Sequence, residues 1–265
     1  MTRNGPIALA FHALFLGFMV IPAGVVVAIA FTPETALAWP AHGLSLRWFR
    51  AILDHPEFIA SLWFSLLLGV AAATLATIVA VPAALAIGRW RFAGRGAILA
   101  VVLSPLMVPA VILGAGLLLL LSMFGLRGTI TGLVLAHAVV VVPFVLRMVL
   151  TGVVGLDSNL DRAAASLGAG GWLTFRLVRL PLLLPGIAGG WVLGFMTSFD
   201  EITVSLFVSG PQTTPLPVRL FSRIVEMPDP LVAAVAVVMM GISGVLLLIL
   251  DRIYGVDRLL SAAPR

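Results

Sequence analysis

The sequence contains no cysteine and no lysine, and it carries little charge of either sign. The absence of cysteine excludes disulfides and thiolate metal sites. The absence of lysine argues against a P-loop, because that motif uses a lysine to reach the β- and γ-phosphates of a nucleotide. Only 10% of the 265 residues are charged, 61% are hydrophobic, and the mean hydropathy is +1.17. Since a soluble domain of this size needs more surface charge, most of the chain is predicted to face lipid.

Six apolar runs are long enough to cross about 30 Å of hydrocarbon as helices. They cover residues 7–31, 58–87, 97–123, 129–150, 183–208 and 231–250. The predicted fold is therefore an all-α polytopic membrane protein, with one integrated transmembrane domain over residues 1–265. The first run is too long for the apolar core of a signal peptide and favours a signal-anchor helix.

Prolines and small residues are placed inside several of these runs. The prolines are Pro22, Pro82, Pro105, Pro109, Pro143 and Pro185. They are consistent with ordinary kinked packing and equally with spans that bend to pass a solute. Glycines such as Gly114, Gly116, Gly190 and Gly194 would let neighbouring helices approach closely.

All 16 basic residues are arginine, and their distribution predicts an orientation. With the N-terminus in the cytoplasm, the outer side receives only five of them: Arg47, Arg50, Arg127, Arg219 and Arg223. The remaining eleven fall on the cytoplasmic side, which predicts that both termini are cytoplasmic. The net charge of +5 is explained by this topology, because the clustered basic face of a nucleic-acid binder is missing.

Between the fourth and fifth runs, residues 151–182 form a polar interruption that the topology places in the cytoplasm. Within it, "DSNLDRAAASLGAGG" predicts a short helix with Ser158 as N-cap, Asp161 in the first turn and Gly168 as the C′ residue. Leu160, Ala164 and Leu167 would form a narrow apolar stripe along it. A second helical segment, "WLTFRLVRL", is expected to end at Pro181 and Pro185. The first of these two helices is too short to be stable alone and needs a packing partner, which is either the lipid headgroups or another protein.

The residue spacing in this interruption resembles the cytoplasmic "EAA" signature of binding-protein-dependent ABC importer permeases. The matching residues are Ala163-Ala164, Gly168-Ala169, Phe175, Leu180-Pro181 and Pro185-Gly186. The likeness continues over nearly the whole chain, through "SPLMVPAVILGAGLLLLL", "LVLAHAVVVVPFVLRMVL" and "GWVLGFMTSFDEITVSLFVSGP", which are similar to segments of spermidine/putrescine-type permeases of the second-subunit kind. One position departs from the family pattern, because Arg162 stands where the family has Glu.

The resemblance implies a function and a set of partners. In the family this loop is a coupling helix that sits in a cleft of the ATP-hydrolysing subunit. The residues carried over to that role are Asp161, Arg162, Ala163, Ala164, Leu167, Gly168, Ala169 and Phe175. The implied partners are a second permease subunit, identical or different, two ATP-binding subunits and an extracytoplasmic solute-binding protein, in a bacterial cytoplasmic membrane. The chain itself would be no enzyme and would bind no cofactor, because the partner subunits use ATP and magnesium.

Asp200 and Glu201 are an acidic pair about 17 residues into the fifth run, roughly 25 Å from its cytoplasmic start at 1.5 Å per residue. They either mark the outer end of the helix or form a cation-attracting mouth of a translocation path. Because adjacent helical residues point about 100° apart, one of the two is expected to face the path, and Asp200 is preferred. Thr203 and Ser205 would add hydroxyl contacts.

The other ionisable residues in the spans give weaker evidence of function. His137 has no His, Asp or Glu three or four positions away, so a hydrogen-bonded packing histidine is favoured over a metal ligand. An intramembrane aspartyl protease needs two converging carboxylates, which adjacent acids cannot provide. The favoured solute is a polyamine such as putrescine or spermidine. The alternatives are another importer solute (an aminophosphonate, an opine or a metal ion) and a stand-alone channel or secondary transporter.

Overall fold

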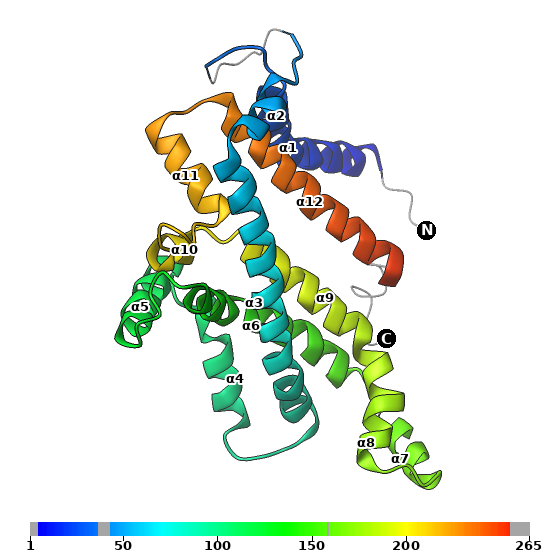
Figure 1. Cartoon of the computed structure of the whole chain (residues 1–265). Coiled ribbons are helices and arrows are strands. Elements are labelled where there is room, and N and C mark those ends of the chain that lie inside the picture. Colours follow the sequence, from blue (N-terminus) through cyan, green and yellow to red (C-terminus); the bar gives the residue numbers. More distant parts are fainter. Residues whose placement is uncertain (1–4, 37–42, 158, 255–265) are drawn as a thin grey trace. The chain divides into compact units, whose positions relative to one another are not determined.

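The computed structural model describes residues 5–36, 43–157 and 159–254, and every regular element in these ranges is helical. The elements are α1 (Pro6–Ala30), α2 (Arg47–Ala51), η1 (Ile52–Asp54), α3 (Pro56–Arg89), α4 (Arg95–Leu103), η2 (Ser104–Leu106), α5 (Ala110–Met123), α6 (Ile130–Val154), α7 (Asn159–Ser166), α8 (Gly171–Thr174), η3 (Phe175–Arg179), α9 (Leu180–Phe199), α10 (Thr203–Val208), α11 (Leu216–Glu226) and α12 (Pro230–Tyr254) (Figure 1). The predicted all-α class is confirmed.

Several long helices begin at residues that suit a helix start. Pro6, Pro56 and Pro230 are the first residues of α1, α3 and α12. A proline at this position costs no hydrogen bond, because the N–H groups of the first turn have no partner within the helix. α6 begins after Thr129, whose Oγ1 accepts a 3.0 Å hydrogen bond from the backbone N–H of Gly132.

Five helices are long and apolar enough to cross a membrane: Pro6–Ala30, Pro56–Arg89, Ile130–Val154, Gly171–Phe199 and Pro230–Ile253. They correspond to the first, second, fourth, fifth and sixth predicted spans. Prolines 22, 82, 143 and 185 lie inside these helices, as expected.

The third predicted span, residues 97–123 with Pro105 and Pro109 inside it, is a bent pair of helices. Residues Arg95–Leu106 and Ala110–Met123 meet at 104°. Pro109 lies at the bend with extended backbone angles (φ −54°, ψ 132°), and the residue before a proline is itself driven out of the helical region. The pair adds a sixth span if both halves belong to one crossing.

The chain divides into two compact units, Met1–Ala60 with Arg219–Ser243 and Ser61–Val218 with Gly244–Arg265. In the first unit, Ala30, Ala233 and Ala234 are buried against aromatic side chains that include Trp48. The Trp48 Nε1–H donates to the carbonyl of Glu34 at 3.1 Å, which ties α2 to the segment after α1. The expected single transmembrane domain over the whole chain stays a prediction.

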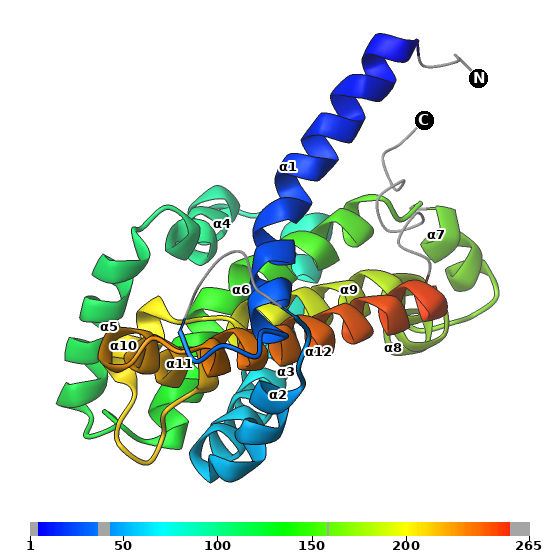
Figure 2. The same ribbon diagram turned by 90° about the horizontal axis from the view of Figure 1, so that it is seen from above.

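The second unit is built around the contact between α6 and α9, which lie side by side (Figures 1 and 2). Glycines make this contact close: a Cβ placed on Gly194 would lie 2.6 Å from Val141 Cγ1 and 3.1 Å from Val145 Cγ2. Gly190 meets Val145 in the same way at 3.3 Å. The close approach predicted at Gly190 and Gly194 is confirmed, whereas Gly116 has nothing within 4 Å of its Cβ position.

Candidate functional site

The interruption between α6 and α9 is shorter than predicted, because α6 runs to Val154 and the next long helix starts at Gly171. Pro181 and Pro185 do not end the second segment: α8, η3 and α9 are continuous through both. The residues 175–179 form a π-helical turn. This wider turn ends two residues before Pro181, whose ring would otherwise collide with the carbonyl four residues earlier.

Within the interruption, α7 has the predicted C-terminal cap. Gly168 adopts a left-handed conformation with φ of +80°. Its N–H donates to the Ala165 carbonyl at 2.9 Å, and the Ala169 N–H donates to the Ala164 carbonyl at 3.0 Å. This pair of bonds is a Schellman motif, and it requires a residue that tolerates positive φ at the C′ position. The prediction of Gly168 as the C′ residue is confirmed.

The start of α7 is fixed by Asp157. Its Oδ1 accepts from the backbone N–H of Asn159 at 2.9 Å and its Oδ2 accepts from the Asn159 side-chain amide at 3.2 Å. The backbone hydrogen bond from Asn159 is the main reason that the pKa of Asp157 is lowered, so the carboxylate stays ionised at neutral pH. The predicted N-cap, Ser158, lies outside the described residues.

Asp161 faces the protein interior rather than solvent. One carboxylate oxygen accepts from Arg179 Nε at 2.8 Å and the other pairs with the guanidinium of Arg89. All three side chains are largely buried, with exposed fractions of 19%, 22% and 23%. Charge-assisted bonds of this kind are the strong ones in proteins. Asp161 therefore ties α7 to the end of α3 and to η3, the turn that leads into α9.

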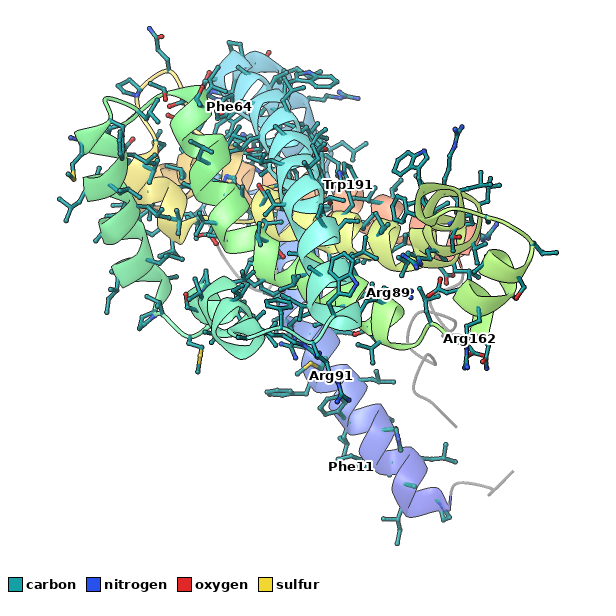
Figure 3. The ribbon with its side chains drawn as sticks, turned by 90° about the horizontal axis from the view of Figure 1, so that it is seen from below. Phe11, Phe64, Arg89, Arg91, Arg162 and Trp191 are labelled. Carbon is teal, nitrogen blue, oxygen red and sulfur yellow. The ribbon has the colours of Figure 1, made fainter. Side chains whose placement is uncertain are left out.

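The predicted stripe of Leu160, Ala164 and Leu167 is not one surface, and Leu167 lies just after the end of α7. Ala164 is 7% exposed, whereas Leu167 is 88% exposed. Arg162 is exposed, and its Nη2 donates to Asn159 Oδ1 at 2.6 Å within the same helix. Figure 3 shows Arg89 near this loop and Arg162 on the loop's outer side.

The outer side of the loop is rich in exposed apolar groups. Ala163 is also exposed and Ala169 is half-buried. The ring of Phe175 is half-buried and lies 5.6 Å, centroid to centroid, from the ring of Trp172. We call the exposed hydrophobic side chains here the α7–η3 surface; they are Leu160, Leu167, Trp172, Leu173 and Leu177. Exposed apolar side chains of this kind are typical of a surface that contacts either a protein partner or lipid.

At the other end of the fifth span, the helix predicted over 183–208 is broken. α9 ends at Phe199 with Asp200 as its C-cap, and α10 begins at Thr203. Glu201 Oε1 accepts from the backbone N–H of Val204 at 2.8 Å and so caps α10. Asp200 is exposed and Thr203 is partly exposed. The two acids therefore differ in their contacts. The Glu201 carboxylate is hydrogen-bonded to the Val204 backbone, whereas the Asp200 side chain is exposed.

His137 lies beside this break and is fully buried. Its Nδ1 is 2.7 Å from Ser198 Oγ in α9, and its Nε2 is 2.9 Å from Ser205 Oγ in α10. The prediction of a hydrogen-bonded packing histidine is confirmed. Ser205 is also buried, and its hydroxyl is bonded to His137 instead of being exposed to a solute, as had been expected. No group of three potential metal-ligating side chains occurs in ranges 5–36, 43–157 and 159–254.

The chain is similar to known transport proteins over most of its length. The model of the family described as "binding-protein-dependent transport system inner membrane component" matches residues 80–256. The spermidine/putrescine transport system permease protein PotC of Haemophilus influenzae is 33% identical over 235 residues, which cover 88% of this chain and 91% of PotC. The putrescine transport system permease protein PotI of Escherichia coli is 30% identical over 243 residues, covering 88% of this chain and 85% of PotI.

A solved structure shares the fold. It belongs to a bacterial ABC transporter involved in the import of the acidic polysaccharide alginate. The TM-score is 0.75 at 15% identity, with 93% of this chain and 94% of that chain covered.

Proposed function

Because the chain belongs to the binding-protein-dependent transport system inner membrane component family, we propose that it carries polyamines across a bacterial cytoplasmic membrane as one permease subunit of an ABC importer. The substrate class rests on the relatives PotC and PotI, whose names give spermidine and putrescine. Within the chain, the observation that supports a cationic solute is the exposed Asp200 at a break in a spanning helix.

The proposed orientation places both termini and the α7–η3 surface in the cytoplasm, where eleven of the 16 arginines would then lie. In this orientation the α9–α10 break faces the outside. The proposed partners are a second permease subunit, two ATP-binding subunits at the cytoplasmic loop and a solute-binding protein outside. ATP hydrolysis is assigned to the ATP-binding subunits.

The α7–η3 surface is the proposed docking site for an ATP-binding subunit. Leu167 and Trp172 are 88% and 71% exposed, and apolar groups exposed to this degree on a cytoplasmic loop favour a protein partner. Arg162 lies on the same side. Because it stands where the family has Glu, it would meet an acidic group of the ATP-binding subunit. Asp161, in contrast, acts inside the chain.

The mechanism we propose is alternating access driven by movement of α7. The ion pairs of Asp161 connect α7 with Arg89 at the end of α3 and with Arg179 before α9. A displacement of α7 by the ATP-binding subunit is therefore passed to two spanning helices together. Rigid-body switching of this kind needs stiff connections at its start, and the capped, ion-paired helix provides one.

The test of the substrate proposal is uptake of labelled putrescine by vesicles carrying the complete importer. Asp200→Asn removes the negative charge at the break and is expected to reduce uptake about tenfold, the effect of losing roughly 1.4 kcal/mol of interaction with a cation. Glu226→Gln, which neutralises an exposed acid in α11, is the matched control and should transport normally. Unchanged uptake in Asp200→Asn would remove this carboxylate from the path. Competition by an aminophosphonate instead of spermidine would reassign the solute.

A further inference from the structure

The break between α9 and α10 is held by a side chain from a third helix. His137 belongs to α6, and its two ring nitrogens reach Ser198, just before the break, and Ser205, just after it. These residues are 61 and 68 positions away in the sequence. The imidazole and both hydroxyls are almost fully buried, with exposed fractions of 0%, 3% and 0%. We call these two hydrogen bonds of His137 with Ser198 and Ser205 the bridge; it lies in the protein interior, away from solvent.

The hydrogen bonds assign the proton on the histidine. Ser205 has one hydroxyl hydrogen, and it donates this hydrogen to the Glu201 carbonyl at 2.8 Å. Ser205 must then accept from His137, so Nε2 carries the hydrogen and Nδ1 accepts from the Ser198 hydroxyl. Each polar atom of the bridge has a partner, and the imidazole is neutral in this arrangement.

The far end of α10 is fixed as well. The Gly128 N–H donates to the Val208 carbonyl at 3.1 Å, and Thr213 Oγ1 donates to the Gly128 carbonyl at 3.0 Å. Val204 and Val208 are buried against residues of α5 and α6. α10 is thus held at both ends, and Asp200 and Glu201 lie on the short connection between the two anchored helices.

We propose that His137 is a positioning residue for transport: it fixes α10 against α9 and so sets where the Asp200 carboxylate is presented. The role of Asp200 itself rests on the proposed function, whereas the mechanical role of His137 does not. Glu201 contributes by capping α10, which satisfies the backbone N–H of Val204 at the break. Non-helical backbone at this position is supported only where such partners are supplied.

The variant that tests the bridge is Ser205→Ala, which removes one hydroxyl and changes little volume. The matched control is Thr197→Ala, because Thr197 Oγ1 donates only within its own helix, to the Leu193 carbonyl at 2.9 Å. In the complete importer, Ser205→Ala should lower putrescine uptake about tenfold, as expected for leaving a buried polar group without its partner. Thr197→Ala should transport like the parent.

A double-mutant cycle with Asp200→Asn separates positioning from general destabilisation. If His137 acts through Asp200, Ser205→Ala costs nothing further once the carboxylate is gone. Additive losses would overturn the proposal and assign the bridge to stability alone.

A distance measurement tests the mechanical claim independently of the solute. Since the sequence has no cysteine, spin labels can be attached at Leu193→Cys in α9 and Leu206→Cys in α10, which are 39% and 43% exposed. The parent importer should give one narrow distance distribution, and Ser205→Ala should broaden or shift it. An unchanged distribution would contradict the bridge. If the parent importer transports no putrescine but Ser205→Ala still broadens its narrow distribution, the polyamine assignment falls and the positioning role stands.

Discussion

Asp161 is the residue whose structural role differs most from its local sequence context. In the sequence it is a first-turn acid that complements the helix dipole, and in the structure it joins Arg89 and Arg179. A local sequence pattern cannot reveal these ion pairs, because Arg89 comes from another helix. Its neighbour Arg162 is the outward-facing residue of the pair. By its resemblance to the EAA signature, Arg162 stands at the position of the family's Glu, and the carboxylate one position earlier pairs with Arg89 and Arg179.

The first prediction concerns this ion-paired carboxylate. Asp161→Asn keeps the shape of the side chain but leaves Arg89 and Arg179 close together without their counter-ion. We expect a loss of about 1.5–3 kcal/mol in the link between α7 and the spans. ATP hydrolysis by the reconstituted importer should persist while solute uptake falls. Asp157→Asn, in the same loop, should change neither, since an asparagine still caps Asn159. Equal behaviour of the two variants would show that Asp161 carries no coupling.

The second prediction concerns helix packing at a glycine. Gly194→Ala would place a methyl group 2.6 Å from buried Val141, and overpacking of this kind costs about 1–3 kcal/mol. Gly116→Ala meets nothing within 4 Å and gains helix propensity, so it should be neutral or stabilising by about 0.5–1 kcal/mol. Thermal unfolding of the two variants in detergent measures the difference. A Gly194→Ala protein as stable as the parent would mean that α6 and α9 separate without cost.

At the scale of elements, the sequence predicted helices well and their breaks poorly. The five long apolar helices and the Schellman cap at Gly168 follow from periodicity and from local turn chemistry. The break after Phe199 was missed, because residues 183–208 read as one apolar run. What determines it lies elsewhere in the chain, in His137 and in the contacts of α10 with α5 and α6. The bend at Pro109 was signalled by its prolines but read as a kink inside one span.

The third prediction concerns the α7–η3 surface as an element. Leu167→Asp places a charge at the centre of the proposed docking site, where burying it against a partner is costly. We expect the ATP-binding subunit to co-purify in much smaller amounts. Leu44→Asp is the matched control, since Leu44 has the same exposed fraction of 88% and lies in the predicted outer loop. Undiminished co-purification with Leu167→Asp would place the docking site elsewhere.

At the scale of the whole molecule, the distribution of arginine predicts which side each surface faces. The fourth prediction tests it with single cysteines in a chain that has none of its own. In intact cells permeable only at the outer membrane, a membrane-impermeant maleimide should label Leu44→Cys and leave Leu167→Cys unmodified. Disrupting the membrane should make the second position reactive. The reverse pattern would invert the topology and, with it, the side on which ATP-binding subunits dock.

The most direct test of the proposed importer role is uptake by the purified importer in proteoliposomes, with its solute-binding protein outside and ATP enclosed. Labelled putrescine should accumulate only when ATP, the ATP-binding subunits and the binding protein are all present. Uptake by this chain alone, without ATP or partners, would contradict it and identify a stand-alone channel or secondary transporter.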